Sequence, residues 1–332
     1  MPQPMNDGWL YEDGIGEERA ALLAGGAIIE ARIERHGAVK AGLVAQVRLV
    51  KQLIAGKRGI AELSDGRALL LSPLPAGLTE GGLVLAEVRR SAISERTRFK
   101  LPLARPAQGK PACTAPTLLD QISSSGIPVR PCHAHEADHF GAAGWHEVTE
   151  LARSGEMDFP GGGLIISVTP AMTVIDVDGA GPPRALAIAA ADACARAIRL
   201  LGLQGSIGID FPGLDSKADR QAAAEALDAA MTGDFERTAI NGFGFMQIVK
   251  RRTGPSLPEL FTMNAQLAGA LELLRCAERS RGTGAVTIIA HPAVIQILEN
   301  KPEWVTELSR RLGRPAALRA DSKLAIESGY AE

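Results

Sequence analysis

Short apolar runs separated by turn residues dominate the chain between residues 18 and 104. The stretch EERAALLAGGAIIEARIER contains two such runs around Gly25-Gly26, a pattern typical of a β-hairpin. The runs GLVAQVRLV, GIAEL, RALLL and LVLAEVRRSAI follow, with turns rich in Gly, Pro and Asp between them. Five or six short strands at this spacing predict a small barrel or an open meander. We place this β-rich domain at residues 1–104.

Residues 105–145 show no sustained hydrophobic period. RPAQGKPACTAPT is rich in Pro and Ala, and SSSGIPVRPCHAHEADHFGAAG follows it. We interpret this segment as a linker with one short helix at Leu118–Ile122.

From residue 146 the pattern alternates between strands and helices. Strands are expected in GGGLIISVT, MTVIDVDG and SIGIDF, and helices at Arg184–Leu201 and Asp215–Met231. We therefore predict a central α/β domain at residues 146–262 and a small C-terminal α/β domain at residues 263–332. The expected fold class is a multidomain α+β protein.

Two aspartates end two of the predicted strands. TVIDVDG carries Asp176 and GSIGIDF carries Asp210, with one long apolar helix between them. A strand–helix–strand unit makes a crossover with parallel strands, which end at one edge of the sheet. The two strand ends would lie roughly 5 Å apart as neighbours, or about 10 Å apart with one strand between them. Two close carboxylates repel unless a cation neutralises them, and oxygen ligands favour Mg²⁺, to which Asp178 could add a third oxygen.

A simpler interpretation of the same aspartates stays open. Aspartates at strand ends commonly cap the following helix or accept hydrogen bonds from loop amides. Spacing alone therefore does not establish a metal site.

A second cluster of metal-ligand residue types lies in CHAHEADH, which contains His133, His135, Asp138 and His139. The spacing resembles that of metallo-β-lactamase-type hydrolases but has one extra residue, and downstream histidines that such a site requires are missing. A solvated linker, a structural or adventitious metal site, and a zinc-type hydrolase all remain open for this cluster. His291, at a strand-to-helix turn, is expected to make a local hydrogen bond.

Composition narrows the functional classes. Apolar residues make up 46% and charged residues 22%, which is typical of globular proteins, and the net charge of −2 argues against a strongly basic nucleic-acid protein. Aromatic residues are only 4%, so base stacking could supply little RNA affinity. Four scattered cysteines predict no disulfides and a reducing, cytoplasmic location. No stretch approaches the roughly twenty apolar residues that a membrane-spanning helix needs, and the first residues lack the basic-then-apolar pattern of a signal peptide.

Several ordered blocks resemble the ribonuclease E/G family of endoribonucleases. FPGGGLIISVTPAMTVIDVDG and LLGLQGSIGIDF are similar to the segments that lead to the family's two metal-binding aspartates. NGFGFMQIVKRRTGPSL is similar to the next block, in which the family has an aromatic-glycine turn, a helix with basic residues and Pro-Ser-Leu. The resemblance implies an OB-like RNA-binding domain at the N-terminus and a DNase I-like catalytic domain at the centre.

The resemblance also implies an activity. Asp176 and Asp210 would hold Mg²⁺, or Mn²⁺ in its place, and single-stranded RNA would be cut to 5′-phosphate and 3′-hydroxyl ends. The competing interpretation is an RNA-binding protein with a weak or inactive site.

This chain departs from the family pattern at four points. Asp178 stands where the family has an asparagine, and Gly242 stands where it usually has an arginine. The pocket for the RNA 5′-monophosphate has no counterpart, so cleavage without 5′-end sensing is expected. Only Cys276 lies near the place of the family's zinc-binding cysteines, so a homodimer would have no zinc bridge.

Basic residues are the expected contacts to RNA phosphates, because the aromatic residues of the family's OB-like domain are replaced by aliphatic ones. The candidates lie at the end of the last barrel strand and after the second aspartate: Arg89, Arg90, Lys250, Arg251 and Arg252.

Overall fold

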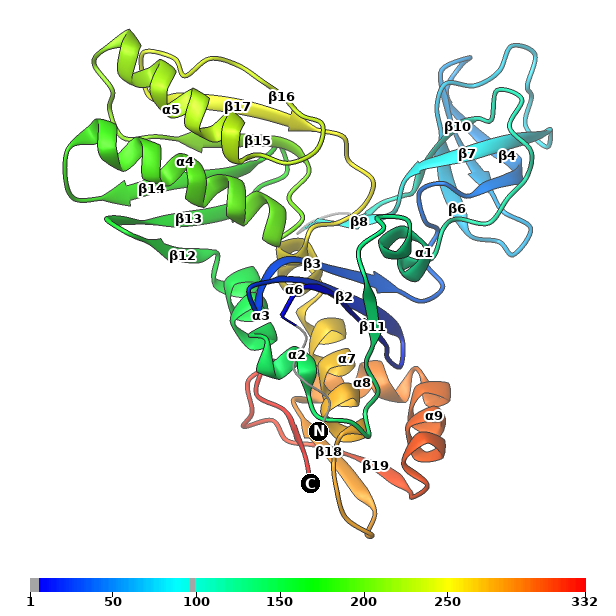
Figure 1. Cartoon of the computed structure of the whole chain (residues 1–332). Coiled ribbons are helices and arrows are strands. Elements are labelled where there is room, and N and C mark those ends of the chain that lie inside the picture. Colours follow the sequence, from blue (N-terminus) through cyan, green and yellow to red (C-terminus); the bar gives the residue numbers. More distant parts are fainter. Residues whose placement is uncertain (1–5, 96–98) are drawn as a thin grey trace. The chain divides into compact units, whose positions relative to one another are not determined.

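The computed structural model describes residues 6–95 and 99–332. The fold is mixed, with helices and strands (Figure 1). The chain divides into two compact units, each built from segments that are distant in sequence. Unit 1 combines residues 1–36, 122–153 and 260–332, and unit 2 combines residues 37–121 and 154–259.

Unit 1 contains a four-stranded sheet with the order β11-β1-β2-β3. The predicted hairpin at Gly25-Gly26 is confirmed, because both glycines have positive φ and join β2 to β3. The strands are β1 (Gly8–Asp13), β2 (Glu17–Ala24), β3 (Ala27–Arg35) and β11 (Val129–Pro131).

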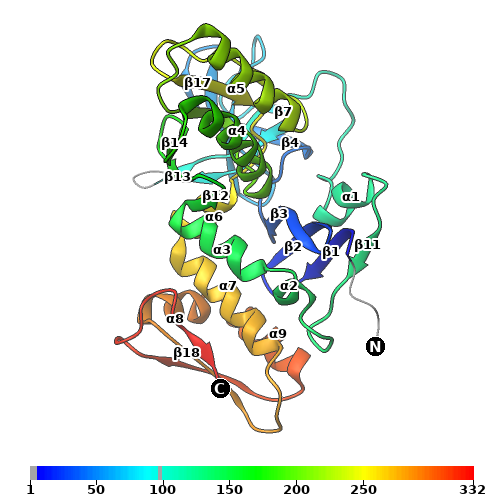
Figure 2. The ribbon, with the colours of Figure 1, turned by 60° about the vertical axis from the view of Figure 1, so that its left-hand side comes forward.

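Helix α7 packs beside this sheet, as Figures 1 and 2 both show. Buried ion pairs join the two: Arg275 of α7 donates to Glu17 at 2.7 Å, and Arg279 pairs with Glu12. The helices of this unit are α2 (His139–Ala142), α3 (Trp145–Ser154), α7 (Ala265–Glu278), α8 (Pro292–Glu299) and α9 (Pro302–Leu312). Its second sheet, with the order β19-β18-β20, is formed by β18 (Val286–Ala290), β19 (Ala316–Ala320) and β20 (Tyr330–Ala331).

Unit 2 contains a closed five-stranded barrel with the order β10-β6-β5-β4-β7. Inward-facing Leu49, Leu69 and Leu71 are fully buried and form its core. A closed barrel of five strands is the architecture expected of an OB-like domain, but strands β1–β3 do not contribute to it. The strands are β4 (Val44–Ile54), β5 (Arg58–Glu62), β6 (Ala68–Leu71), β7 (Leu83–Arg90) and β10 (Leu103–Pro106). Between β7 and β10 in the sequence, β8 (Ile93–Ser94) pairs with β9 (Phe99–Lys100), and the short helix α1 (Leu118–Ser123) follows β10.

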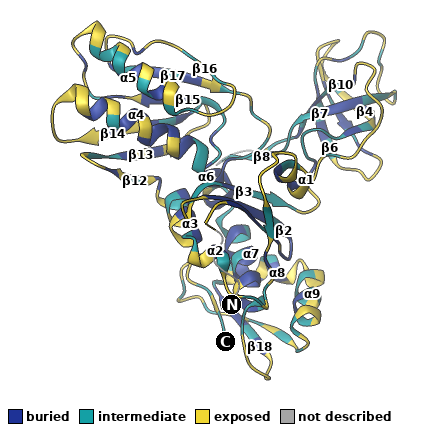
Figure 3. Cartoon of the chain, in the orientation of Figure 1, coloured by how far each residue is buried: buried dark blue, intermediate teal, exposed yellow. Residues whose placement is uncertain are grey.

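The second half of unit 2 is a six-stranded sheet with the order β12-β13-β14-β15-β17-β16. Helices α4 (Pro183–Leu200) and α5 (Lys217–Ala230) lie side by side over one face of it (Figure 1). Both helices bury one side and expose the other (Figure 3), as an amphipathic helix on a sheet does. The strands are β12 (Glu156–Phe159), β13 (Gly162–Val168), β14 (Thr173–Gly179), β15 (Gly205–Asp210), β16 (Glu236–Arg237) and β17 (Phe245–Lys250).

Most predicted elements are present, and the main differences arise from strand pairing with segments that are distant in sequence. The segment expected to be a linker also contains β11 and α2, because β11 gains backbone hydrogen bonds by parallel pairing with β1. Phe245–Lys250 is a strand rather than the helix expected from the resemblance: Met246 and Ile248 are buried in alternation, with period 2. Helix α6 (Leu257–Thr262) ends shortly before α7, and the side chain of Asn264 caps the start of α7.

After α9 the chain forms β19 and then the two-residue β20. All four cysteines are free. Of the helices formed by the described residues, none combines the length and the apolar character needed to cross a membrane.

Candidate metal and RNA site

Asp176 and Asp210 lie directly opposite each other on adjacent parallel strands. Strand β14 pairs with β15 in parallel, and the register places Asp176 beside Asp210. Residues paired in this way project their side chains from the same face, with strands about 5 Å apart. Ile175 and Ile209, one residue earlier, are fully buried on the helix-covered face. The two aspartates are therefore directed to the face that α4 and α5 leave uncovered.

The uncovered face of the sheet is acidic. The cross-strand register runs from Glu156 through Ile165 to Asp176 and Asp210, and a neighbouring row runs from Asp158 through Gly163 to Asp178. All five carboxyl residues are exposed. Such a concentration of negative charge repels RNA phosphates and attracts cations.

The two aspartates are available as ligands. No hydrogen bond or ion pair joins Asp176 or Asp210 to another of the described residues, so neither caps a helix or accepts from a loop amide. Mg²⁺ keeps several waters and binds through one or two carboxylates together with substrate phosphates. The pair fits that ligand set. Asp178 lies about 7 Å further along β14, and the three aspartates do not form a group with ligand atoms within 4.8 Å.

A tight turn formed by residues 241–244 lies next to Asp210. The Asn241 side chain accepts hydrogen bonds from the backbone N–H of Phe243 at 2.8 Å and of Phe245 at 3.1 Å. Gly244 has φ +88 and its carbonyl accepts from the N–H of Phe211, the residue after Asp210. A Cβ at Gly244 would lie 2.5 Å from the Phe211 carbonyl oxygen, so glycine is required there. The turn is thus anchored next to Asp210.

This turn presents an aromatic side chain to solvent. Phe243 is 91% exposed, and Phe245 pairs with Asp210 on the uncovered face. The Phe245 ring lies over Gly208, where an added Cβ would come within 2.5 Å of the ring. Composition alone could not reveal this placement, because aromatic residues are scarce in the chain as a whole. The signal was the pair of phenylalanines around Gly244, directly before an alternating strand.

The segment that contains both aspartates is similar in sequence to known proteins. A model of the Ribonuclease E/G family matches residues 123–253, which include β14, β15 and β17. Ribonuclease E of Nostoc sp. (strain PCC 7120) is 30% identical over 128 residues, or 35% of this chain and 19% of that protein. Ribonuclease G of Salmonella typhimurium is 35% identical over 109 residues, or 29% of this chain and 22% of that protein. Residues 123–253 are thus similar in sequence to the Ribonuclease E/G family.

The similarity is confined to part of each relative. Ribonuclease E of Escherichia coli (strain K12) is 32% identical over 123 residues, which are 33% of this chain and 12% of that protein. The chain thus matches less than a quarter of the length of these three relatives. The matched segment nevertheless contains both aspartates and the turn at Phe243.

The basic residues expected to contact RNA differ in how free their side chains are to bind a phosphate. Arg89 pairs with Glu87 at 3.0 Å, and Arg90 donates to the Leu101 carbonyl at 2.7 Å. Three others follow the second aspartate. Lys250 donates to the Thr232 carbonyl at 2.9 Å, Arg252 forms an ion pair with Glu259, and Arg251 is exposed with no such contact to the described residues.

The histidine cluster does not assemble a metal site of its own among the described residues. His133 and His135 stack with ring centroids 5.6 Å apart, whereas His139 lies 2.9 Å from the Arg130 guanidinium. His133, His135 and Asp138 line a cavity of about 710 Å³ in unit 1, together with buried Cys132. Burial raises the pKa of the Cys132 thiol to about 11, so it is a poor thiolate ligand. A zinc-type hydrolase is therefore not favoured.

His291 acts as expected from its position. Its Nδ1 accepts from the backbone N–H of Ala293 at 3.1 Å and caps α8. This local role explains a histidine at the strand-to-helix turn without any ligand.

Proposed function

We propose that this chain is an endoribonuclease that cuts single-stranded RNA with Asp176 and Asp210 as the ligands of a divalent cation, Mg²⁺ or Mn²⁺. The observation that carries the proposal is the cross-strand register of these two residues, which are exposed, lie on one face and are free of competing partners. They lie within the segment that matches the family. The sheet with α4 and α5 would be the DNase I-like catalytic domain, and the barrel an OB-like RNA-binding domain.

Asp176 and Asp210 would hold the cation with their carboxylate oxygens. A bound divalent cation would supply a more acidic water and would neutralise charge that builds up on the phosphate. Asp178 lies further along the strand and would accept hydrogen bonds from water at the site. The expected products have 5′-phosphate and 3′-hydroxyl ends.

The protein surface around the pair selects and positions the RNA. Phe243 is proposed to stack on a nucleobase, which requires an unpaired base and so favours single strands. Arg251 is the basic candidate with the clearest access to a backbone phosphate, while Arg89, Arg90, Lys250 and Arg252 would first have to release their present contacts.

Three further properties complete the proposal, two of which rest on departures of this sequence from the family pattern. We propose cleavage that does not depend on the RNA 5′ end, a cytoplasmic location and a homodimer without bridging zinc. The division into parts at residues 1–104, 105–145, 146–262 and 263–332 likewise stays a prediction.

The test is cleavage of a labelled single-stranded RNA in Mg²⁺ by the wild-type protein, Asp176→Asn and Asp210→Asn. Each substitution preserves shape and removes one ligand charge, so we expect the rate to fall by at least about 100-fold, as for the loss of one positioned catalytic group. Glu156→Gln is the matched control, because it removes a carboxylate from the same face with β13 between it and Asp176. Its rate should equal that of the wild type.

Two results would refute the proposal. Undiminished cleavage by both aspartate variants would place the chemistry elsewhere, and RNA binding by the wild type without any cleavage would leave a binding protein with an inactive site. Equal cleavage rates for RNAs with 5′-triphosphate and 5′-monophosphate ends would support independence from the 5′ end.

A further inference from the structure

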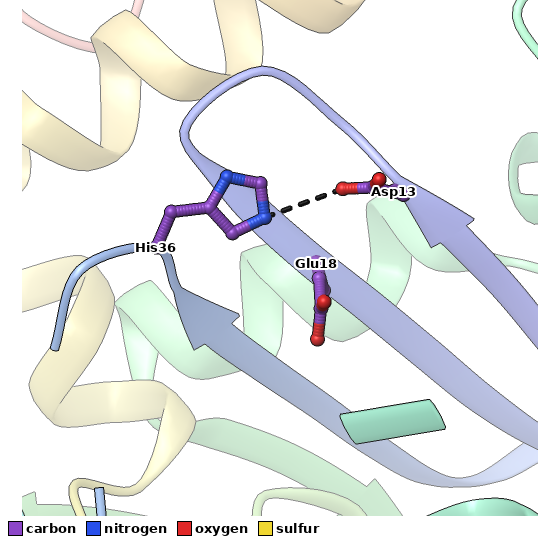
Figure 4. Close-up of side chains that lie close together, drawn as sticks. All are labelled: Asp13, Glu18 and His36. Atoms are coloured by element: carbon purple, nitrogen blue, oxygen red, sulfur yellow. Dashed lines mark ion pairs between the residues drawn. The ribbon is translucent and has the colours of Figure 1, made fainter. Parts of the chain in front are cut away.

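Three residues with metal-binding side chains meet at the end of the four-stranded sheet of unit 1. Asp13 ends β1, Glu18 lies near the start of β2 and His36 directly follows β3. One ligand atom from each lies within 4.8 Å of the others (Figure 4). In the part of the chain that the structure describes, no other group of three histidine, cysteine or carboxylate residues meets this condition.

The backbone holds these three positions in place. Asp13 pairs directly with Glu18 across β1 and β2, and the N–H of His36 donates to the carbonyl of Gly16 at 2.9 Å. The turn between β1 and β2 is closed by the hydrogen bond from the Gly14 N–H to the Glu17 carbonyl. The ligands therefore project from three adjacent strands of one sheet, a rigid base for a site.

The spacing of two of the ligands is close to that of a metal site. Nε2 of His36 lies 3.2 Å from Oδ1 of Asp13. Two ligands of a tetrahedral ion with bonds of about 2.0–2.2 Å lie about 3.4 Å apart. A carboxylate oxygen of Glu18 lies within 4.8 Å of a ligand atom of each of the other two residues, and Figure 4 shows Glu18 on the strand between them, below the dashed line that joins His36 to Asp13.

The charges around the group favour a cation. Oε2 of Glu18 is buried and has no hydrogen-bond partner among the described residues, an unfavourable state for a carboxylate oxygen. Arg19 and Arg35 pair with Glu12 and Glu17 on the opposite face of the sheet. Arg311 donates to the backbone carbonyl of Asp13 at 3.2 Å, and its charge is balanced by ion pairs with Glu278 and Glu307.

From this geometry we propose that Asp13, Glu18 and His36 form a binding site for a divalent transition-metal ion of the zinc class. The donor set of one imidazole nitrogen and two carboxylate oxygens leaves a fourth position for water, as in three-ligand zinc sites. Mg²⁺ is excluded as the preferred ion because it takes oxygen ligands in octahedral geometry. The site is independent of the proposed nuclease centre, since it lies in the other unit and selects a different ion.

The first experiment is calorimetric titration of the chelator-treated full chain with Zn²⁺, compared with His36→Ala and Glu18→Gln. We expect one site in the wild type and at least a tenfold loss of affinity in each variant, since even residues behind the ligands contribute about 10- to 100-fold. A double variant, His133→Ala with His135→Ala, is the matched control and should bind as the wild type does. Titration with Mg²⁺ should give no heat from this site.

A second measurement is the visible spectrum of the protein loaded with Co²⁺, which reports a distorted tetrahedral site with nitrogen and oxygen ligands. The wild type should show intense d–d bands, and His36→Ala should lose them while it keeps its far-ultraviolet circular dichroism. Zn²⁺ should also raise the Tm of the wild type but not of His36→Ala, because only the folded state assembles the three ligands.

The proposal fails if Zn²⁺ binds His36→Ala and the wild type equally, or if the histidine double variant loses the binding instead. It also fails if the wild type binds no Zn²⁺ at micromolar concentration. None of these outcomes depends on RNA cleavage, so they do not bear on the nuclease proposal.

Discussion

Replacing Phe243 by alanine separates RNA positioning from folding. The side chain is 91% exposed, so its loss should change the free energy of unfolding by no more than about 0.5 kcal/mol. Stacking of one base on an aromatic ring contributes roughly 1–3 kcal/mol. At about 1.4 kcal/mol for each factor of ten, Phe243→Ala should weaken binding of single-stranded RNA by roughly 5- to 150-fold.

The assay is steady-state cleavage of a short single-stranded RNA in Mg²⁺, with KM and kcat determined separately. Stacking that is equal in the ground state and in the transition state changes KM and leaves kcat nearly constant. Phe243→Trp should retain the wild-type KM, whereas Phe243→Leu keeps an apolar side chain but loses the ring and should behave as Phe243→Ala does. Double-stranded RNA has no free base to offer, so its binding should not change.

The reasoning would be refuted by a Phe243→Ala protein with the wild-type KM for single strands. Phe243→Leu with full affinity would show that apolar contact rather than stacking is involved. A large fall in kcat with unchanged KM would instead place Phe243 in the alignment of the aspartates.

Three further predictions concern charged residues. Arg275→Met should lower the free energy of unfolding by about 3 kcal/mol in urea denaturation, because it leaves buried Glu17 with only the more distant guanidinium of Arg35, 3.8 Å away. Exposed Arg310→Met should change it little. The guanidiniums of Arg19, Arg275 and Arg279 outweigh the effect of burial and lower the pKa of Glu12 below 4.5. The contribution of Glu12 to stability is therefore present above pH 4.5 and is lost as the pH falls through the lowered pKa. A Tm that stays constant down to pH 3 would contradict this. Arg251→Ala should reduce the slope of log binding constant against log salt by about 0.7, measured by fluorescence anisotropy, and an unchanged slope would remove Arg251 from the RNA interface.

The sequence pattern predicted much of the local structure. An apolar run ending on Asp176, an alanine-rich helix and a second run ending on Asp210 correctly indicated two parallel strands joined by a crossover. Local periodicity suffices there because each element is long enough to show its own period. The resemblance in the same blocks indicated the family that the comparisons then supported.

Other features depended on partners that are distant in sequence. The three residues of β11 are too short for a visible period and form a strand only because β1 is beside them. The resemblance suggested a helix at Phe245–Lys250, but pairing with β15 makes it a strand.

By itself the sequence determined which residues could bind a cation and which strands would carry them, because side-chain chemistry and hydrophobic period are local properties. Only the tertiary structure decided that Asp176 and Asp210 face the uncovered side without competing hydrogen bonds, and that Phe243 stands exposed beside them. It also brought Asp13, Glu18 and His36 together, although no motif marks them in the sequence. The physical reason is that strand register and the packing of helices on one face are set by contacts between segments far apart along the chain.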